Sequence, residues 1–147
     1  MLAACLCLLP ACTGPRFPHL DECPDPMMES MAWVSIDGTV VDVGDDLRFR
    51  LKTDEGRTVV VSIPNVGAAK DGRAVPRLKR LVQGRRVTVF VNPSYADDPE
   101  ITGEVHAGNV DVGRQLLAEG LVSFVRAEPY TISGYSECLN RIAATKR

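Results

Sequence analysis

The sequence has no surplus of charge of either sign. Its 17 basic and 19 acidic residues nearly cancel, which leaves a formal net charge of −2. The chain therefore has no overall field that would draw it onto nucleic acid. Any surface that binds an anion must be local.

Several signatures of catalysis and cofactor binding are also absent. The sequence contains no phosphate-binding loop, no dinucleotide fingerprint and no nucleophile elbow. Its two histidines, His19 and His106, have no second histidine or cysteine at ligand spacing, which argues against a zinc site. Internal repeats are missing too, and 147 residues give room for one domain and a tail.

The first eleven residues, MLAACLCLLPA, carry no charged side chain. An apolar run of about ten residues is too short to span a bilayer permanently and is typical of a secretory signal, although the usual basic segment before it is missing. We expect residues 1–12 to be a signal peptide or lipoprotein leader and the proline-rich residues 13–31 to be a tether. A cytoplasmic protein with an apolar N-terminus is the alternative.

The five cysteines divide between this leader and the domain. The stretch LLPAC resembles the bacterial lipoprotein box and predicts lipidation of Cys12, whereas LAAC, which ends at Cys5, fits the box better but leaves almost no leader. Cys23 and Cys138 remain, and two cysteines in an exported domain usually pair. We therefore expect a Cys23–Cys138 disulfide, with two free buried thiols as the alternative.

Alternation of apolar and polar residues indicates five short strands. The expected strands cover residues 32–41, 47–52, 58–63, 87–91 and 101–106. Between them, Asn65 to Arg73 is expected to be a glycine-containing loop, and Asn92 to Glu100 a polar loop.

Three helices are expected beside these strands. The first has Pro76 in its first turn and stops at Gly84. The second is capped by Asn109 or Asp111, and Gly120 permits the left-handed conformation that ends it. An apolar stripe at helical spacing indicates the third helix. This stripe consists of Tyr135, Cys138, Leu139, Ile142 and Ala143.

The order of these elements predicts a fold that is mainly β with helices, an α+β fold. Five short strands with a helix between the third and the fourth suit a five-stranded OB-type barrel with about three helices packed on its outside. We expect this domain to span residues 32–147. A mixed α+β sandwich is the alternative architecture.

With these elements in place, the chain resembles the staphylococcal-nuclease-like (thermonuclease-like) family of decorated OB barrels. The stretch VVDVGDDLRFRL looks like the family's first hairpin, and NVDVGRQLLAEGLVSFV looks like its second helix and the run beyond it. YSECLNRIAATKR looks like the start of its last helix. The resemblance implies calcium-assisted phosphodiester hydrolysis, with two aspartates on the ion, a glutamate that activates water, and two arginines on the phosphate.

Only one of these residues has a match. Asp45 follows Gly44, as the first metal aspartate of the family does. No carboxylate and no arginine occur from Val59 to Ala69, where the resemblance places the other acidic residues and an arginine, and DDPEITGEV is acidic where the second arginine should stand. We therefore assign no catalytic residue.

A calcium ion at Asp45 is the one cofactor that the resemblance offers. Calcium requires six to eight oxygen ligands, so Asp45 with Asp46 beside it makes a poor site, and a plain turn between strands is the alternative interpretation. The Asp-x-Pro-Glu sequence of residues 97–100 lies in the wrong loop and is interpreted as a solvated turn.

A basic concentration from Lys70 to Arg86 offers the candidate anion-binding residues Arg73, Arg77 and Arg80. Arg77 and Arg80 share one helical face, which is compatible with a groove that tracks phosphates. No aromatic residue is interleaved to stack bases. The solvated face of an amphipathic helix is the interpretation that we favour.

These patterns predict an exported, lipid-anchored, monomeric domain whose nuclease-like site is largely degenerate. The domain would act as a binding or structural module at the cell envelope, with a nucleic acid or an envelope protein as partner. One alternative is an active calcium-dependent phosphodiesterase with a rearranged site. The other is a purely structural lipoprotein in which the barrel is a rigid spacer.

Overall fold

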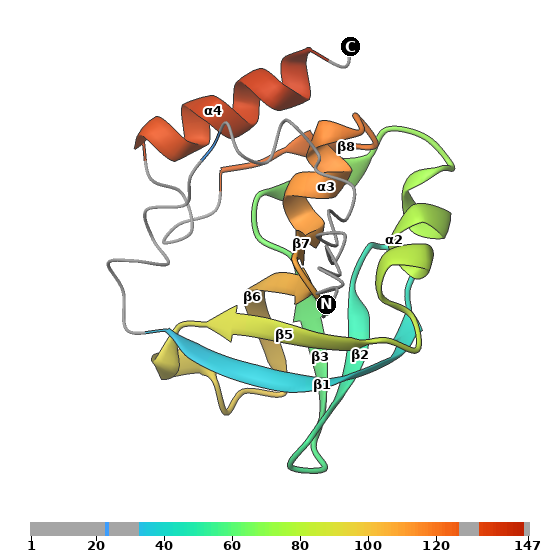
Figure 1. Ribbon diagram of the computed structural model, residues 1–147, viewed down its shortest axis with the longest axis vertical. Helices are drawn as coiled ribbons and strands as arrows, with labels where there is room; N and C mark the ends of the chain where they lie inside the picture. The colour runs from blue at the N-terminus through green and yellow to red at the C-terminus, as the bar shows by residue number, and fades with distance from the viewer. Residues whose placement is uncertain (1–22, 24–32, 127–132, 146–147) are drawn as a thin grey trace, which may run out of the picture.

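The computed structural model describes Cys23, residues 33–126 and residues 133–145 (Figure 1). Its centre is a closed barrel of five strands. The barrel strands are β1 (Val34–Val43), β2 (Phe49–Thr53), β3 (Thr58–Ser62), β5 (Arg86–Val91) and β6 (Glu100–Ala107). Antiparallel pairs run in the order β3-β2-β1-β5-β6, and a parallel pair between β3 and β6 closes the ring. The predicted OB-type α+β fold is confirmed.

Strand β1 holds the barrel together because it pairs on both edges. Its first half, from Val34 to Thr39, lies beside β5, and its second half, from Gly38 onward, lies beside β2. The two pairings overlap at Gly38 and Thr39, and an added Cβ at Gly38 would collide with the backbone carbonyl of Lys52. Glycine is therefore required at the point where β1 passes from one neighbour to the other.

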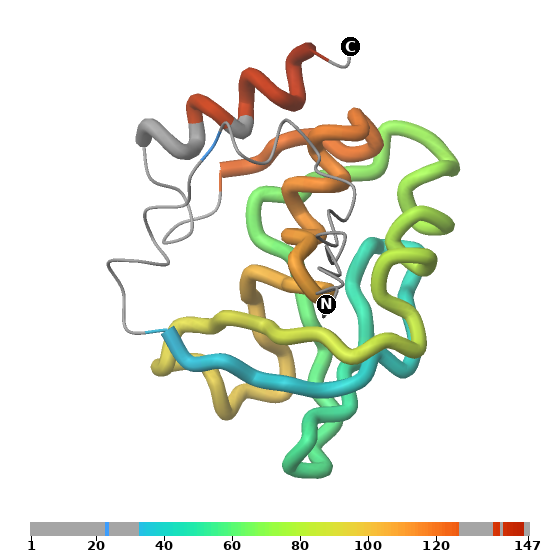
Figure 2. Tube along the Cα trace, in the orientation of Figure 1, coloured from blue at the N-terminus to red at the C-terminus, as the bar shows by residue number. Residues whose placement is uncertain are grey.

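One predicted loop is wrong in part. Within Asn65 to Arg73, residues Val66–Ala69 form the strand β4, which pairs with β8 (Val122–Phe124) in a separate two-stranded sheet, side by side in Figure 2. The partner lies more than fifty residues further along the chain, so no local pattern could indicate the pairing. The predicted polar loop between β5 and β6 contains a short 3-10 turn, η1 (Pro93–Tyr95).

The three predicted helices are present. They are α2 (Ala74–Val82), α3 (Val112–Ala118) and α4 (Ser133–Ala144). Helix α2 lies between β4 and β5, and α3 follows directly on the short strand β7 (Val110–Asp111). Helix α4 packs against α3 and β8, at the end of the molecule away from β1 (Figure 1).

Helix α3 is short, and both of its ends are closed by local interactions. Of the two predicted caps, Asp111 is the one used, since its Oδ1 accepts a hydrogen bond from the backbone N–H of Arg114 at 3.1 Å. Gly120 has φ +69°, and the N–H of Leu121 donates to the carbonyl of Leu116. This is the predicted left-handed stop.

Gly113 costs a short helix about 1 kcal/mol relative to alanine, but it has a packing role. A Cβ at this position would lie 2.9 Å from Cγ2 of Ile63. The missing side chain therefore lets the start of α3 approach the end of β3, which fixes the helix against the barrel.

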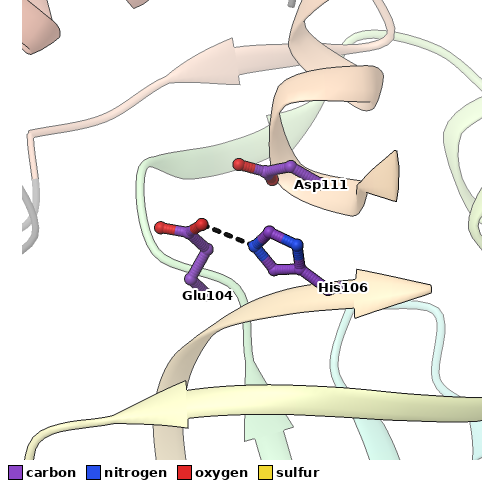
Figure 3. Close-up of side chains that lie close together, drawn as sticks. All are labelled: Glu104, His106 and Asp111. Carbon is purple, nitrogen blue, oxygen red and sulfur yellow. Dashed lines mark hydrogen bonds and ion pairs between the residues drawn. The ribbon is translucent and has the colours of Figure 1, made fainter. Parts of the chain in front are cut away.

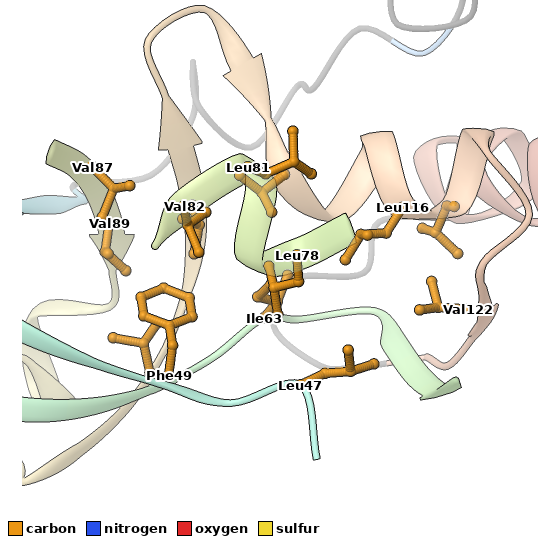
Figure 4. Packing of buried hydrophobic residues seen from close by; sticks show 14 of the residues in the cluster. Leu47, Phe49, Ile63, Leu78, Leu81, Val82, Val87, Val89, Leu116 and Val122 are labelled. Atoms are coloured by element: carbon orange, nitrogen blue, oxygen red, sulfur yellow. The ribbon is translucent and has the colours of Figure 1, made fainter. Parts of the chain in front are cut away.

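One hydrophobic core joins the barrel to the helices (Figure 4). Phe49 and Val89 point into it from the barrel, Leu78 and Val82 from α2, and Leu116 from α3. All five are at most 1 % exposed. The position of α2 relative to α3 is therefore set by shared buried contacts, not by the loops alone.

Cys23 and Cys138 form the predicted disulfide, with a Cα–Cα distance of 5.8 Å and a sequence separation of 115 residues. Cys138 is buried on α4 together with Ile142 and Ala143, as the apolar stripe predicts. The expected leader, the lipidation of Cys12 and the rest of the tether lie outside the described residues. Over the described ranges, no helix is long and apolar enough to cross a membrane.

Candidate functional site

The turn between β1 and β2 contains the predicted metal ligand, Asp45. The neighbouring Asp46 closes this turn, because it accepts hydrogen bonds from the backbone N–H of Arg48 at 3.1 Å and from its Nε at 2.7 Å. These bonds lower the pKa of the Asp46 carboxyl. Asp45 itself is exposed and belongs to no group of three potential ligands among the residues that the structure describes. A metal ion at Asp45 stays a prediction.

The segments that lack the expected catalytic residues have structural roles. Val59, Val61 and Ile63 are buried in the barrel. In the exposed Asp-x-Pro-Glu segment, residues 97–99 form a turn that leads into β6 at Glu100, and Arg57 donates to the carbonyl of Asp97 at 3.3 Å.

The predicted anion-binding residues do meet in one place. Arg73, Arg77 and Arg80 all line a surface pocket of about 490 Å³ between the exposed side of α2 and the end of α3. Their spacing of four and three residues puts them on one face of α2. The remaining lining residues are Gly72, Pro76, Glu119 and Leu121. We call this site the arginine pocket.

Arg77 is bound by a residue that the sequence did not suggest. Its Nε and NH2 groups donate to the two carboxylate oxygens of Glu119, each at 2.8 Å, in a bidentate fork. Arg77 is 24 % exposed and Glu119 is 31 % exposed, so the pair is partly shielded from water. Glu119 is the C-cap of α3, and the pair therefore ties α2 to α3 across 42 residues of sequence.

The charge state of this pair follows from its surroundings. Burial raises the pKa of the Glu119 carboxyl, but the hydrogen bond from Arg77, with further contributions from Gln115 and from the charge of Arg80, outweighs burial and lowers it. The hydrogen bond to Glu119 raises the pKa of Arg77. Both groups are thus ionised at neutral pH.

The other two arginines are more accessible. Arg73 is 72 % exposed and donates to Asp71, which lies beside the pocket. Arg80 is exposed and makes no hydrogen bond or ion pair with any residue that the structure describes; its charge acts on Glu119 through space. Three positive charges and one negative charge therefore line the pocket, and Arg80 is the cation best placed to meet a ligand.

Comparison with known proteins adds no assignment, since no family model and no curated protein matches the chain. The candidate site therefore rests on its own residues. The sequence identified the three arginines because they belong to one basic stretch of the chain, but it missed Glu119, whose partner is set by tertiary packing.

Proposed function

We propose that this domain is a non-catalytic binding module that takes a phosphate-bearing ligand into the arginine pocket. The observation that carries the proposal is the convergence of Arg73, Arg77 and Arg80 on one pocket, whose described lining residues include a single carboxylate, that of Glu119. Glu119 balances Arg77 and Asp71 balances Arg73, so about one positive charge, that of Arg80, is left for a ligand. A pocket of about 490 Å³ also falls within the usual range for small-ligand sites.

The lining favours phosphate over a nucleobase. Guanidinium groups match the geometry of phosphate oxygens in bidentate pairs. Among the residues that the structure describes, none that lines the pocket is aromatic, so these residues offer no platform on which a base could stack. An oligonucleotide would therefore bind through its backbone without sequence preference, and a small phosphorylated compound would bind through its phosphate groups.

Fluorescence anisotropy with a labelled single-stranded oligonucleotide tests this proposal, with unlabelled pyrophosphate as competitor. One phosphate neutralised by Arg80 predicts a slope of about −0.7 for the logarithm of the binding constant against the logarithm of the salt concentration. Displacement of the labelled oligonucleotide by pyrophosphate would show that a small phosphorylated compound is enough to occupy the pocket. A binding constant that does not change with salt would contradict the proposal.

Lys79 provides a matched control on the same helix. It is exposed, as Arg80 is, but it does not line the pocket. Arg80→Glu is expected to weaken binding by about tenfold or more, since hydrogen bonds to charged groups contribute about 1.5 to 3 kcal/mol each. Lys79→Glu should have a much smaller effect. Equal losses in both variants would mean that general charge, and not the pocket, attracts the ligand.

We also propose kinship with the staphylococcal-nuclease-like family, together with loss of its hydrolytic site. The closed barrel, the helix before β5 and the Gly120 stop of α3 support the kinship. The buried apolar residues of β3 support the loss, because a group that stabilises developing charge is usually worth orders of magnitude in rate.

The alternative, an active phosphodiesterase with a rearranged site, has a direct test. The chain is incubated with single-stranded DNA and RNA in calcium, beside an Asp45→Ala variant and a chelator control. We expect no turnover above the controls. Turnover that both controls abolish would overturn the degenerate-site proposal and make Asp45 a metal ligand.

The proposed location is the cell envelope, with a lipid on Cys12. The Cys23–Cys138 disulfide supports export, because disulfides persist in oxidising compartments. Intact-mass measurement of the protein recovered from the membrane fraction tests this, and an unmodified N-terminus that retains residues 1–12 would contradict it. An envelope protein captured equally by wild type and Arg80→Glu would instead favour a protein-binding module.

A further inference from the structure

A second group of polar side chains lies at the other end of α3. Glu104 and His106 flank Val105 on β6, and because Val105 is fully buried, its two neighbours face away from the barrel interior. The β6–β7 pairing places Asp111 opposite His106. The three side chains therefore meet outside the barrel at the start of α3 (Figure 3).

The distances within this group suit a small cation. His106 Nε2 lies 2.6 Å from Glu104 Oε1, and one ligand atom of each of the three side chains lies within 4.8 Å of the others. The side chains of Glu104, His106 and Asp111 are 16 %, 27 % and 12 % exposed. Carboxylates this close in a partly shielded space stabilise a positive charge between them.

The surrounding structure holds these ligands in place. The imidazole of His106 packs edge-on against Phe90, with ring centroids 5.3 Å apart and an interplanar angle of 87°. Asp111 is fixed by its hydrogen bond to the backbone N–H of Arg114. Two of the three side chains are thus oriented by contacts outside the group, as in sites where outer contacts position metal ligands.

We propose that Glu104, His106 and Asp111 bind a divalent transition-metal ion of the zinc class. An imidazole nitrogen with two carboxylates is a ligand set for such ions, whereas calcium requires more oxygen ligands than this group has. The side chain of Arg114, whose Nε lies 3.8 Å from Asp111 Oδ2, offsets one negative charge. The group remains net negative when His106 is neutral.

Binding requires only a small rearrangement. Zinc lies about 2.0 to 2.2 Å from nitrogen and oxygen ligands, which places tetrahedral ligand atoms about 3.4 Å apart. Glu104 and His106 would separate slightly as the ion replaces the proton of their hydrogen bond, and Asp111 would move inward. Each of the three residues also takes part in a further interaction, which the ion must accommodate or displace.

His106 has no second histidine or cysteine at ligand spacing in the sequence, but carboxylates also bind zinc. Glu104 is two residues away on the same face of β6, and Asp111 comes from the far side of a hairpin. A carboxylate two residues before a histidine is common in sequences. This pattern therefore predicts a metal site only when the register of the hairpin is known.

Isothermal titration calorimetry of the full chain with zinc chloride tests the proposal, with cobalt chloride and calcium chloride as comparisons. Cys5→Ser, Cys7→Ser and Cys12→Ser are present in every sample, because thiols in the N-terminal segment would also bind zinc. We expect one zinc ion per chain, with weaker cobalt binding in line with the usual order of affinities and no calcium binding. Calcium binding as tight as that of zinc would overturn the proposal.

Variants then locate the site. Asp111→Asn removes a charged ligand but keeps a good helix cap, so α3 should remain folded. This change and His106→Ala are each expected to weaken zinc binding at least about tenfold, since even the loss of an outer contact costs about 10- to 100-fold. Glu100→Gln, an exposed change on the same strand, is the control. Unchanged zinc affinity in Asp111→Asn and His106→Ala, with the fold verified by circular dichroism, would refute the site.

Discussion

The two ends of α3 gather opposite charges. At its start, the carboxylate of Glu104 and the imidazole of His106 lie beside the N-cap residue Asp111. At its end, three arginines surround the C-cap residue Glu119. One seven-residue helix thus carries the proposed cation site and the proposed anion site on its two caps.

The two ends also differ in how they are assembled. The acidic group comes from residues 104–111, a single hairpin and the cap that follows it. The arginine pocket needs two helices that are brought together by the core, with Arg77 and Glu119 42 residues apart. The cation site therefore depends on local structure, and the anion site depends on tertiary packing.

Loss of the disulfide should have the largest effect on this arrangement, because α4 packs on α3 and is joined by Cys138 to Cys23. Replacement of both cysteines by alanine is expected to lower the free energy of unfolding by about 4 to 5 kcal/mol, as chain entropy predicts for so long a loop. Urea denaturation measures the change, with reduced wild type as control. Equal stability of the oxidised and reduced wild-type proteins would contradict it.

A substitution that leaves a cavity beneath α2 should affect ligand binding differently at the two ends of α3. Leu78 is fully buried, and Leu78→Ala is expected to cost about 2 to 5 kcal/mol in unfolding free energy. At a urea-free condition where the variant is still folded, oligonucleotide binding should weaken because α2 shifts, whereas zinc binding should persist. If zinc binding fell as much as oligonucleotide binding, the acidic group would also depend on α2.

A substitution of Glu119 should strengthen ligand binding in the arginine pocket and leave the cation site unchanged. Glu119→Gln removes the one carboxylate from the pocket lining and releases Arg77, so oligonucleotide binding is expected to tighten about threefold to tenfold. Glu55→Gln, an exposed change in another turn, controls for net charge. Weaker binding in Glu119→Gln would show that the carboxylate positions Arg77 for the ligand.

The smallest effect is a dependence of stability on pH. The pKa of Glu119 is lower in the folded protein than its usual value of 4.5, so its contribution is present above pH 4.5 and is lost as the pH falls through the folded-state pKa. For a pair that is only partly shielded, about 1 kcal/mol or less is expected. The difference in unfolding free energy between wild type and Glu119→Gln, followed from pH 7 to pH 3, should shrink, and a constant difference would contradict this.

The sequence predicted the features whose causes are local. Alternation gave the five barrel strands, and Gly120 gave the stop of α3. Arg77 and Arg80 were found because helical spacing alone puts them on one face, and Arg73 was found because it belongs to the same basic stretch. Strand β4 was missed because its partner, β8, is distant in sequence.

The polar pairings of both sites escaped prediction for two different reasons. The contact of Glu119 with Arg77 depends on how α2 packs against α3. The meeting of Glu104, His106 and Asp111 depends on hairpin register, since a slip of one residue would turn Asp111 to the other face. The Cys23–Cys138 pair was predictable because only two cysteines were expected outside the leader.

Amide chemical shifts, measured by two-dimensional NMR on the full chain, test the central claim that the two ends of α3 bind ligands of opposite charge. Pyrophosphate should shift amides of residues 72–80 and 119–121, and zinc chloride should shift amides of residues 104–114. Each ligand should leave the other set nearly unchanged. Shifts from both ligands in one set, or no saturable shift in either, would contradict the claim.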